Sequence, residues 1–170
     1  MAECYTSVRN APPEFGKGCE EEVRLSRSEP GKRWAQRTLF TNEDDCNVAP
    51  PEWHARGPEA EADFIEGCRN EVMQRRMAEG RFWARDNFIF TPADCRADLP
   101  GVKHNPDFIA GCEDIIQHRP LAQDGQTYAQ KNSITRLEAC HGTVKNAPPQ
   151  FEAGCEKYVR DLELAEAQRR

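Results

Sequence analysis

The sequence predicts an all-α fold of four tandem helical hairpins, each tied by a disulfide and packed into one compact array. Three observations lead to this prediction: eight cysteines that fall into four pairs, a motif Phe-x-x-Gly-Cys that closes every pair, and a near absence of strand signals. A motif that recurs with its cysteine in register is an internal repeat, which has to be recognised before a fold is assigned. The motif occupies residues 15–19, 64–68, 108–112 and 151–155.

The first cysteine of a unit is expected to lie on a short helix. The segments Thr41–Cys46, Thr91–Cys95 and Thr135–Cys140 all start with a threonine that is followed by an acidic residue three positions later. This spacing is the signature of a capping box, in which the two side chains bond the free N–H groups of the first turn. In the second of these segments, proline follows the threonine, where a helix tolerates it.

A proline-containing loop is expected to lead from there to a longer helix that carries the second cysteine. Asn10, Asn105 and Asn146 are the expected N-caps, each with a proline one or two residues later. From the phenylalanine onward, Phe, Cys and Val or Ile stand at i, i+4 and i+8, which is one face of a helix. The glycine before each cysteine costs a helix about 1 kcal/mol relative to alanine. Its recurrence therefore predicts that another backbone or the disulfide packs closely against it.

A third motif, an aromatic residue followed by alanine, joins the units at Trp34, Trp83 and Tyr128. Recurrence in a repeat favours packing between units, while a series of partner-binding aromatics is the alternative. Segments 28–32 and 120–125 contain proline and glycine, which we interpret as breaks between units. The expected single domain thus has four repeats, at about 1–30, 31–79, 80–124 and 125–170.

All eight cysteines are expected to form disulfides inside their own units. The predicted bonds are Cys4–Cys19, Cys46–Cys68, Cys95–Cys112 and Cys140–Cys155. The alternative, pairing across units as 19–46, 68–95 and 112–140, leaves the two outer cysteines without partners. Leu, Ile, Val and Phe make up only 28 of 170 residues, below the ~20 % at which chains begin to resemble disordered ones. Since one cross-link is worth roughly 3 kcal/mol, the disulfides are expected to supply much of the stability.

Disulfides persist in secreted or periplasmic proteins, so we expect a periplasmic or extracellular location, with a signal peptide that has been removed. No apolar run is long enough to cross a bilayer, and membrane insertion is not expected. The formal net charge of −6, with lysine and arginine scattered along the chain, argues against binding to nucleic acid.

Neither a metal site nor a cofactor is predicted. Structural zinc sites need cysteines two to four residues apart, whereas no Cys-x-x-Cys occurs here. The four histidines, His54, His104, His118 and His141, do not align within the repeat and are interpreted as surface residues. No nucleophile elbow or phosphate-binding glycine loop is present, so we predict no catalytic residue and no enzymatic activity. An envelope hydrolase that uses a carboxylate–histidine pair, and a metal-handling protein, are the alternative hypotheses.

The second unit departs from the repeat through an insertion between Trp53 and Asp63. Insertions in repeats map to surface loops, often on the binding face, and tryptophan is enriched at interface hot spots. We therefore predict that Trp53, His54 and Arg56 contact another protein; the alternative is that Trp53 folds back to fill a gap near Cys46 and Cys68. The sequence as a whole predicts a secreted or periplasmic, non-enzymatic protein-binding module. An inhibitor or immunity-type protein that acts on a toxin or hydrolase is one such role.

Overall fold

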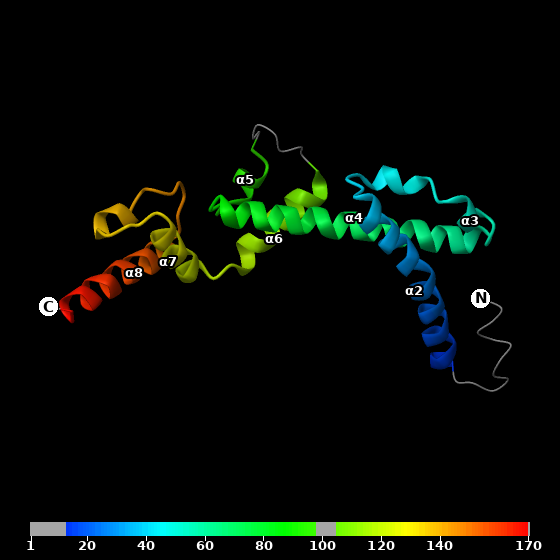
Figure 1. Ribbon diagram of the computed structural model, residues 1–170, viewed down its shortest axis with the longest axis horizontal. Helices are drawn as coiled ribbons and strands as arrows, with labels where there is room; N and C mark the ends of the chain where they lie inside the picture. Colours follow the sequence, from blue (N-terminus) through cyan, green and yellow to red (C-terminus); the bar gives the residue numbers. More distant parts are fainter. Residues whose placement is uncertain (1–12, 98–104, 170) are drawn as a thin grey trace. The chain divides into compact units, whose positions relative to one another are not determined.

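The computed structural model describes residues 13–97 and 105–169, which form an all-α fold (Figure 1). These residues contain seven α-helices, two short 3-10 helices and no strand. The chain divides into two compact units, Met1–Arg76 and Met77–Arg170. In chain order the elements are α2 (Pro13–Thr38), η1 (Glu43–Asn47), α3 (Pro51–His54), α4 (Pro58–Asp86), α5 (Pro92–Cys95), α6 (Pro106–His118), α7 (Leu121–Lys131), η2 (Leu137–Cys140) and α8 (Pro149–Ala167).

Disulfides join a short helix to the long helix that follows it in three places. The bonds are Cys46–Cys68 between η1 and α4, Cys95–Cys112 between α5 and α6, and Cys140–Cys155 between η2 and α8. Their Cα–Cα distances of 5.8, 5.9 and 5.6 Å are ordinary for disulfides. The predicted pairing inside each repeat is confirmed for these six cysteines, and the alternative of pairing between neighbouring repeats is excluded. The predicted Cys4–Cys19 bond involves a residue outside the described ranges.

The predicted caps are confirmed at Thr91 and Asn105, whereas Thr41 and Thr135 are not caps, because η1 is capped by the next residue, Asn42, and η2 starts after Arg136 without a side-chain cap. The hydroxyl of Thr91 accepts a hydrogen bond from the Asp94 N–H at 3.3 Å. The side chain of Asn105 accepts from the N–H groups of residues 107 and 108 at 2.9 and 3.2 Å. Asn146 does not cap α8, because Pro148 occupies that position and Asn146 itself has a left-handed backbone with φ of 59°. The predicted cap Asn10 lies outside the described residues.

Within the first unit, α2 crosses α4 at a pair of glycines (Figure 1). A Cβ atom added to Gly31 of α2 would lie 1.8 Å from the carbonyl oxygen of Phe64, and one added to Gly67 of α4 would lie 2.0 Å from that of Ser28. No real pair of atoms comes so close, so only glycine fits on either side. Cα–H···O contacts between backbones are typical of such crossings. Gly67, which precedes the second cysteine, therefore packs against another backbone, as predicted; at Gly18 of α2 the prediction is wrong, because within the described residues nothing lies within 4 Å of a Cβ placed there.

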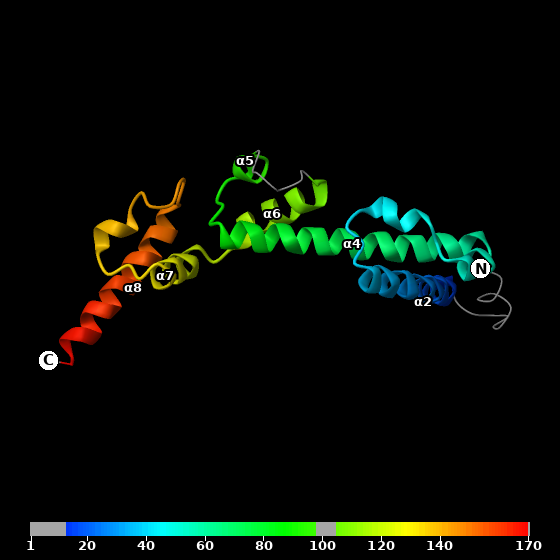
Figure 2. The same cartoon turned by 45° about the horizontal axis from the view of Figure 1, so that its top comes forward.

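Two further crossings with the same reciprocal geometry lie in the second compact unit, Met77–Arg170. At the α4–α6 crossing, a Cβ on Gly80 or on Gly111 would lie 2.0 Å from the opposite carbonyl oxygen. At the α7–α8 crossing, where the two helices lie side by side in Figures 1 and 2, the corresponding distance is 1.9 Å for both Gly125 and Gly154. In all three crossings each glycine faces the carbonyl located three residues before the other glycine.

The crossings correct one sequence interpretation. Segment 28–32 does not separate two elements, because α2 runs through Pro30 and Gly31 without a break. Gly31 is required for close approach to α4 rather than for a turn. By contrast, Pro120 does mark a boundary, since α6 ends at His118 and α7 begins at Leu121.

The core of the described residues consists of small clusters, three of which surround a disulfide. Each of three clusters contains one disulfide and the alanine of the aromatic–alanine motif, namely Ala35, Ala84 or Ala129, all with no exposed surface. The aromatic residue before each alanine packs on the phenylalanine of the next long helix. The ring-centroid distances are 5.4 Å for Trp34–Phe64, 5.7 Å for Trp83–Phe108 and 5.5 Å for Tyr128–Phe151. These aromatics are therefore packing residues, as the recurrence of the motif favoured.

Candidate functional site

The predicted binding residue Trp53 lies in the four-residue helix α3, which begins with a proline at its first position. Its side chain is only 8 % exposed and stacks on Phe64 at a centroid distance of 4.6 Å with an interplanar angle of 26°. Ala49 completes this cluster. Trp53 thus packs on Phe64 of α4 rather than projecting fully into solvent.

The other two predicted binding residues lie on the solvent side of this cluster. His54 Nδ1 is 2.7 Å from a carboxylate oxygen of Glu61, which ties the end of α3 to the first turn of α4 within the insertion. The guanidinium carbon of Arg56 lies 4.4 Å from the centroid of the Trp53 ring, in cation–π geometry. Both side chains are exposed. Their role in binding stays a prediction.

A cleft of about 310 Å³ opens beside Trp53 in the first unit. Three aromatic side chains line it, from α2, α3 and α4: Trp34, Trp53 and Phe64. Its remaining lining is Pro30, Arg33, Arg37, Pro50 and Glu52. We call this space the aromatic cleft. Trp53 lines this cleft with the small part of its side chain that is exposed, since its ring packs on Phe64 and Arg56 lies over it.

Two arginines on α2 give the aromatic cleft a positive rim. Arg33 and Arg37 are one helical turn apart and flank Trp34, so both follow from the helix geometry. The Arg33 guanidinium lies 3.4 Å from Glu29, and Glu52 is the carboxylate in the lining. Neither arginine was predicted from the sequence as a site residue. The signal that could have found them was their i, i+4 spacing around a recurring tryptophan.

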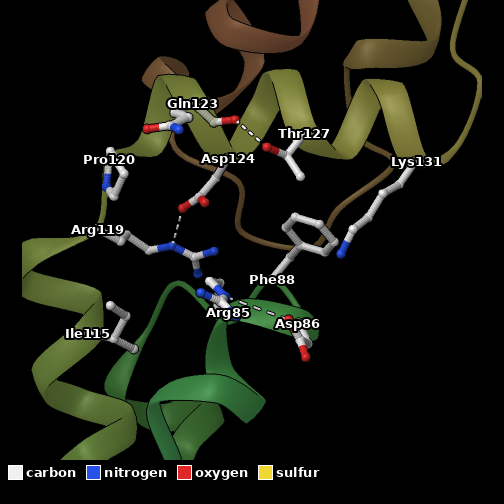
Figure 3. A pocket seen from close by; sticks show the side chains of 10 residues that line it. All are labelled: Arg85, Asp86, Phe88, Ile115, Arg119, Pro120, Gln123, Asp124, Thr127 and Lys131. Atoms are coloured by element: carbon white, nitrogen blue, oxygen red, sulfur yellow. Dashed lines mark hydrogen bonds and ion pairs between the residues drawn. The ribbon is translucent and has the colours of Figure 1, made fainter.

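A second cleft, of about 380 Å³, lies in the second unit and is shown in Figure 3. Its most buried charged residue is Arg119, which comes directly after α6. The Arg119 Nε donates to Asp124 of α7 at 2.6 Å, and Nη1 donates to the Ile89 carbonyl at 2.7 Å. The same guanidinium lies over the ring of Phe90 at 4.7 Å.

Arg119 has a counterpart in the first unit, which identifies its role. Arg75 donates to the carbonyl oxygens of Ala35 and Phe40 at 3.3 Å, and Arg119 donates to those of Ala84 and Ile89. Both arginines stand seven residues after a second cysteine. Each therefore ties the end of one helix to the cysteine-bearing helix packed against it. Arg119 is a structural residue that also lines the cleft.

The polar lining of this second cleft is otherwise mixed in charge. Arg85 and Lys131 supply cations and Asp86 supplies a carboxylate, which lies 3.6 Å from Arg85. Among the described residues, Nη2 of Arg119 has no hydrogen-bond partner, and it is buried away from solvent. Because Nη2 is not accessible, it cannot donate a hydrogen bond to a ligand in the cleft. The cations and carboxylates of the lining also leave no concentrated charge of one sign.

The histidines pair with carboxylates at three separate places, none of which lines either cleft. His54 pairs with Glu61, His118 with Asp114, and His141 lies 3.2 Å from both Glu152 and Glu156. In the ranges 13–97 and 105–169, no group of three His, Cys, Asp or Glu side chains is arranged to hold a metal ion. His104 lies outside these ranges.

No protein-family model, no curated protein and no solved structure matches this chain. Three disulfides indicate an oxidising compartment outside the cytoplasm. None of the described helices is both long enough and apolar enough to cross a membrane.

Proposed function

We propose that the chain is a non-enzymatic protein-binding module of the periplasm or the cell exterior. Its aromatic cleft receives a side chain of the partner. One observation carries this proposal: the insertion that the other repeats lack places Trp53 beside Trp34 and Phe64, and the three rings line a cleft with an arginine rim.

The chemistry of the cleft specifies the partner segment. Aromatic walls favour an apolar or aromatic side chain, and such rings combined with arginine are typical of interface hot spots. Arg33 and Arg37 outnumber Glu52 at the rim, although the whole chain carries a net charge of −6. The rim therefore favours a partner segment in which a carboxylate flanks the apolar residue.

The finer architecture belongs to the same proposal. The chain consists of four copies of one hairpin, and the aromatic cleft is a specialised feature of the second copy. His54 and Arg56 lie on the same inserted segment as Trp53 and extend the contact surface beyond the cleft. A role as an inhibitor or immunity-type protein, blocking a toxin or hydrolase by surface contact, is compatible with this arrangement.

The alternatives remain hypotheses with less support. An envelope hydrolase requires a carboxylate–histidine pair beside a place for the substrate, whereas the pairs observed here lie away from both clefts. A metal-handling protein requires ligands that converge, and the disulfide sulfurs of the described bonds are already committed to one another.

The test is affinity capture from an envelope extract with the oxidised full chain as bait, followed by mass spectrometry and a binding assay with the captured protein. Arg37→Glu reverses the charge of the rim and should weaken binding at least tenfold. Lys32→Glu is the matched control, because it makes the same charge change at an exposed position of α2 outside the cleft. A partner that binds both variants equally well would exclude the cleft as the contact site.

A further inference from the structure

The aromatic cleft of the first unit has room for one side chain of a partner and little more. Its volume of about 310 Å³ is at the lower end of the roughly 300–1,000 Å³ typical of ligand pockets. The described residues contain no strand, so an extended partner segment cannot pair its backbone with a sheet edge here. Two lining residues, Pro30 and Pro50, also have no backbone N–H to donate. Recognition of a partner at this cleft therefore depends on the side chains that line it.

The charged side chains of the aromatic cleft come from two different elements. Arg33 and Arg37 belong to α2, whereas Glu52 belongs to α3. All three residues are exposed. The charges of the lining are therefore separated, with the cations on the α2 wall and the carboxylate on the α3 wall. A ligand that matches both walls presents a negative group toward α2 and a hydrogen-bond donor toward α3.

Arg37 is the cation of this lining that is available to a negative group. The Arg33 guanidinium lies 3.4 Å from Glu29 of the same helix, whereas Arg37 has no ion-pair partner among the described residues. Arg37 also stands three residues after Trp34, and residues at this spacing lie on the same side of a helix, with Cβ atoms about 5–6 Å apart. A carboxylate bound by Arg37 therefore lies close to the ring of Trp34, and close to the side chain that the rings receive.

The α-carboxylate of a C-terminal residue meets this distance requirement better than an acidic side chain does. In an extended segment successive side chains point to opposite faces, so an acidic residue next to the apolar one points away from the cleft. The nearest side chain on the same face is about 7 Å along the chain. In a terminal residue, by contrast, the side chain, the carboxylate and the amide nitrogen are all attached to one Cα atom. These three groups correspond to the rings, to Arg37 and to Glu52 of the lining.

We propose that the aromatic cleft binds the C-terminal residue of the partner protein, and that this residue is aromatic. Its ring packs against the aromatic lining, its α-carboxylate accepts hydrogen bonds from Arg37, and its amide N–H donates to Glu52. An aromatic ring is favoured because pairs of rings gain energy beyond the area that they bury. Charge-assisted hydrogen bonds to a carboxylate are stronger than those to the neutral carbonyl of an internal residue. This inference rests on the proposed function, because it names the partner segment that the same cleft receives.

The probes are short peptides with fluorescein at the N-terminus, a glycine–serine linker and a final phenylalanine or tryptophan, each made as the free acid and as the C-terminal amide. Fluorescence anisotropy measures their binding to the oxidised full chain. The free acid of at least one sequence should bind at least tenfold more tightly than its amide. Arg37→Gln should weaken the acid alone, so that acid and amide bind equally. Glu52→Gln should weaken both, because both carry the amide N–H.

The matched control is Lys32→Gln, which removes a positive charge at an exposed position of α2 outside the cleft. It should leave the preference for the free acid unchanged. Because Arg37 and Glu52 are also exposed, their variants should fold normally, as circular dichroism will show.

The outcomes that overturn this inference differ from those that exclude the cleft as a contact site. No binding by either free acid, or equal binding of acid and amide to the unmodified chain, overturns it. So does an amidated peptide with an aspartate after the aromatic residue, if it binds as tightly as the free acid; the cleft then recognises an internal carboxylate, and the proposed function stands. A captured partner that binds equally well without its last residue, yet is weakened by Arg37→Glu, leads to the same conclusion.

Discussion

The first half of α2 and the first half of α4 carry the same motif and differ completely in their surroundings. Both are helical, and both place a phenylalanine three residues before a glycine. In α4 the two residues are buried under α2, while in α2 they are exposed. The motif therefore forms a helix whose glycine allows a second helix to pack closely against it. Whether a crossing forms depends on a second helix with its own glycine in register.

The largest difference between the two regions should come from their phenylalanines. Phe64→Ala removes a ring that contacts both Trp34 and Trp53, so we expect a loss of about 3–5 kcal/mol in the free energy of unfolding. Phe15→Ala should cost less than about 1 kcal/mol, because half of that ring is already in solvent. Urea denaturation followed by far-UV circular dichroism measures both. Equal losses would mean that Phe15 is buried in solution.

The two structural arginines extend the comparison to the second unit. The Arg119 side chain is 1 % exposed and pairs with Asp124, whereas the Arg75 side chain is 27 % exposed. Arg119→Met leaves a mostly buried carboxylate unpaired and should cost about 3 kcal/mol. Arg75→Met should cost about 1 kcal/mol, since solvent can replace part of its interactions. The same denaturation assay applies, and a larger loss for Arg75→Met would contradict the assigned roles.

The smallest effect is also the most diagnostic, because its sign changes between the regions. Gly67→Ala forces a Cβ against the Ser28 carbonyl and should destabilise the protein by about 1–3 kcal/mol. Gly18→Ala replaces a poor helix former in open space and should stabilise it by about 0.5–1 kcal/mol. The thermal midpoint should therefore fall for the first variant and rise for the second. A fall for both would show that Gly18 is covered.

Much of the fold could be predicted because the recurring motifs determine it through short-range spacing. Cysteine register, helical spacing and the caps at Thr91 and Asn105 depend on residues close together in the chain. Close packing at the glycine before each second cysteine was also predicted, which is correct for Gly67, Gly111 and Gly154 and wrong for Gly18. The predicted break at Gly31 was wrong, because the sequence alone does not distinguish a glycine required for a helix crossing from one required for a turn.

The candidate site was harder to predict, since it depends on distant parts of the chain. Trp53 was identified from the insertion, but its stacking on Phe64 and its position beside Trp34 follow from how α2 and α4 meet. Arg33 and Arg37 looked like ordinary surface charges for the same reason. The exposure of Phe15 and Gly18 could not be predicted either, because the four copies of the motif look alike in the sequence.

The burial of the cysteines has a consequence for redox chemistry. Cys46, Cys68, Cys112 and Cys155 have no exposed surface, and their bonded partners Cys95 and Cys140 have 4 and 2 %. Thiol–disulfide exchange requires a thiolate to reach a sulfur atom directly. Reduction of these three bonds therefore requires local opening of their hairpins, and its rate is set by local unfolding rather than by the reactivity of the thiol. The disulfides that hold the helices together are in turn shielded by those helices from reductants.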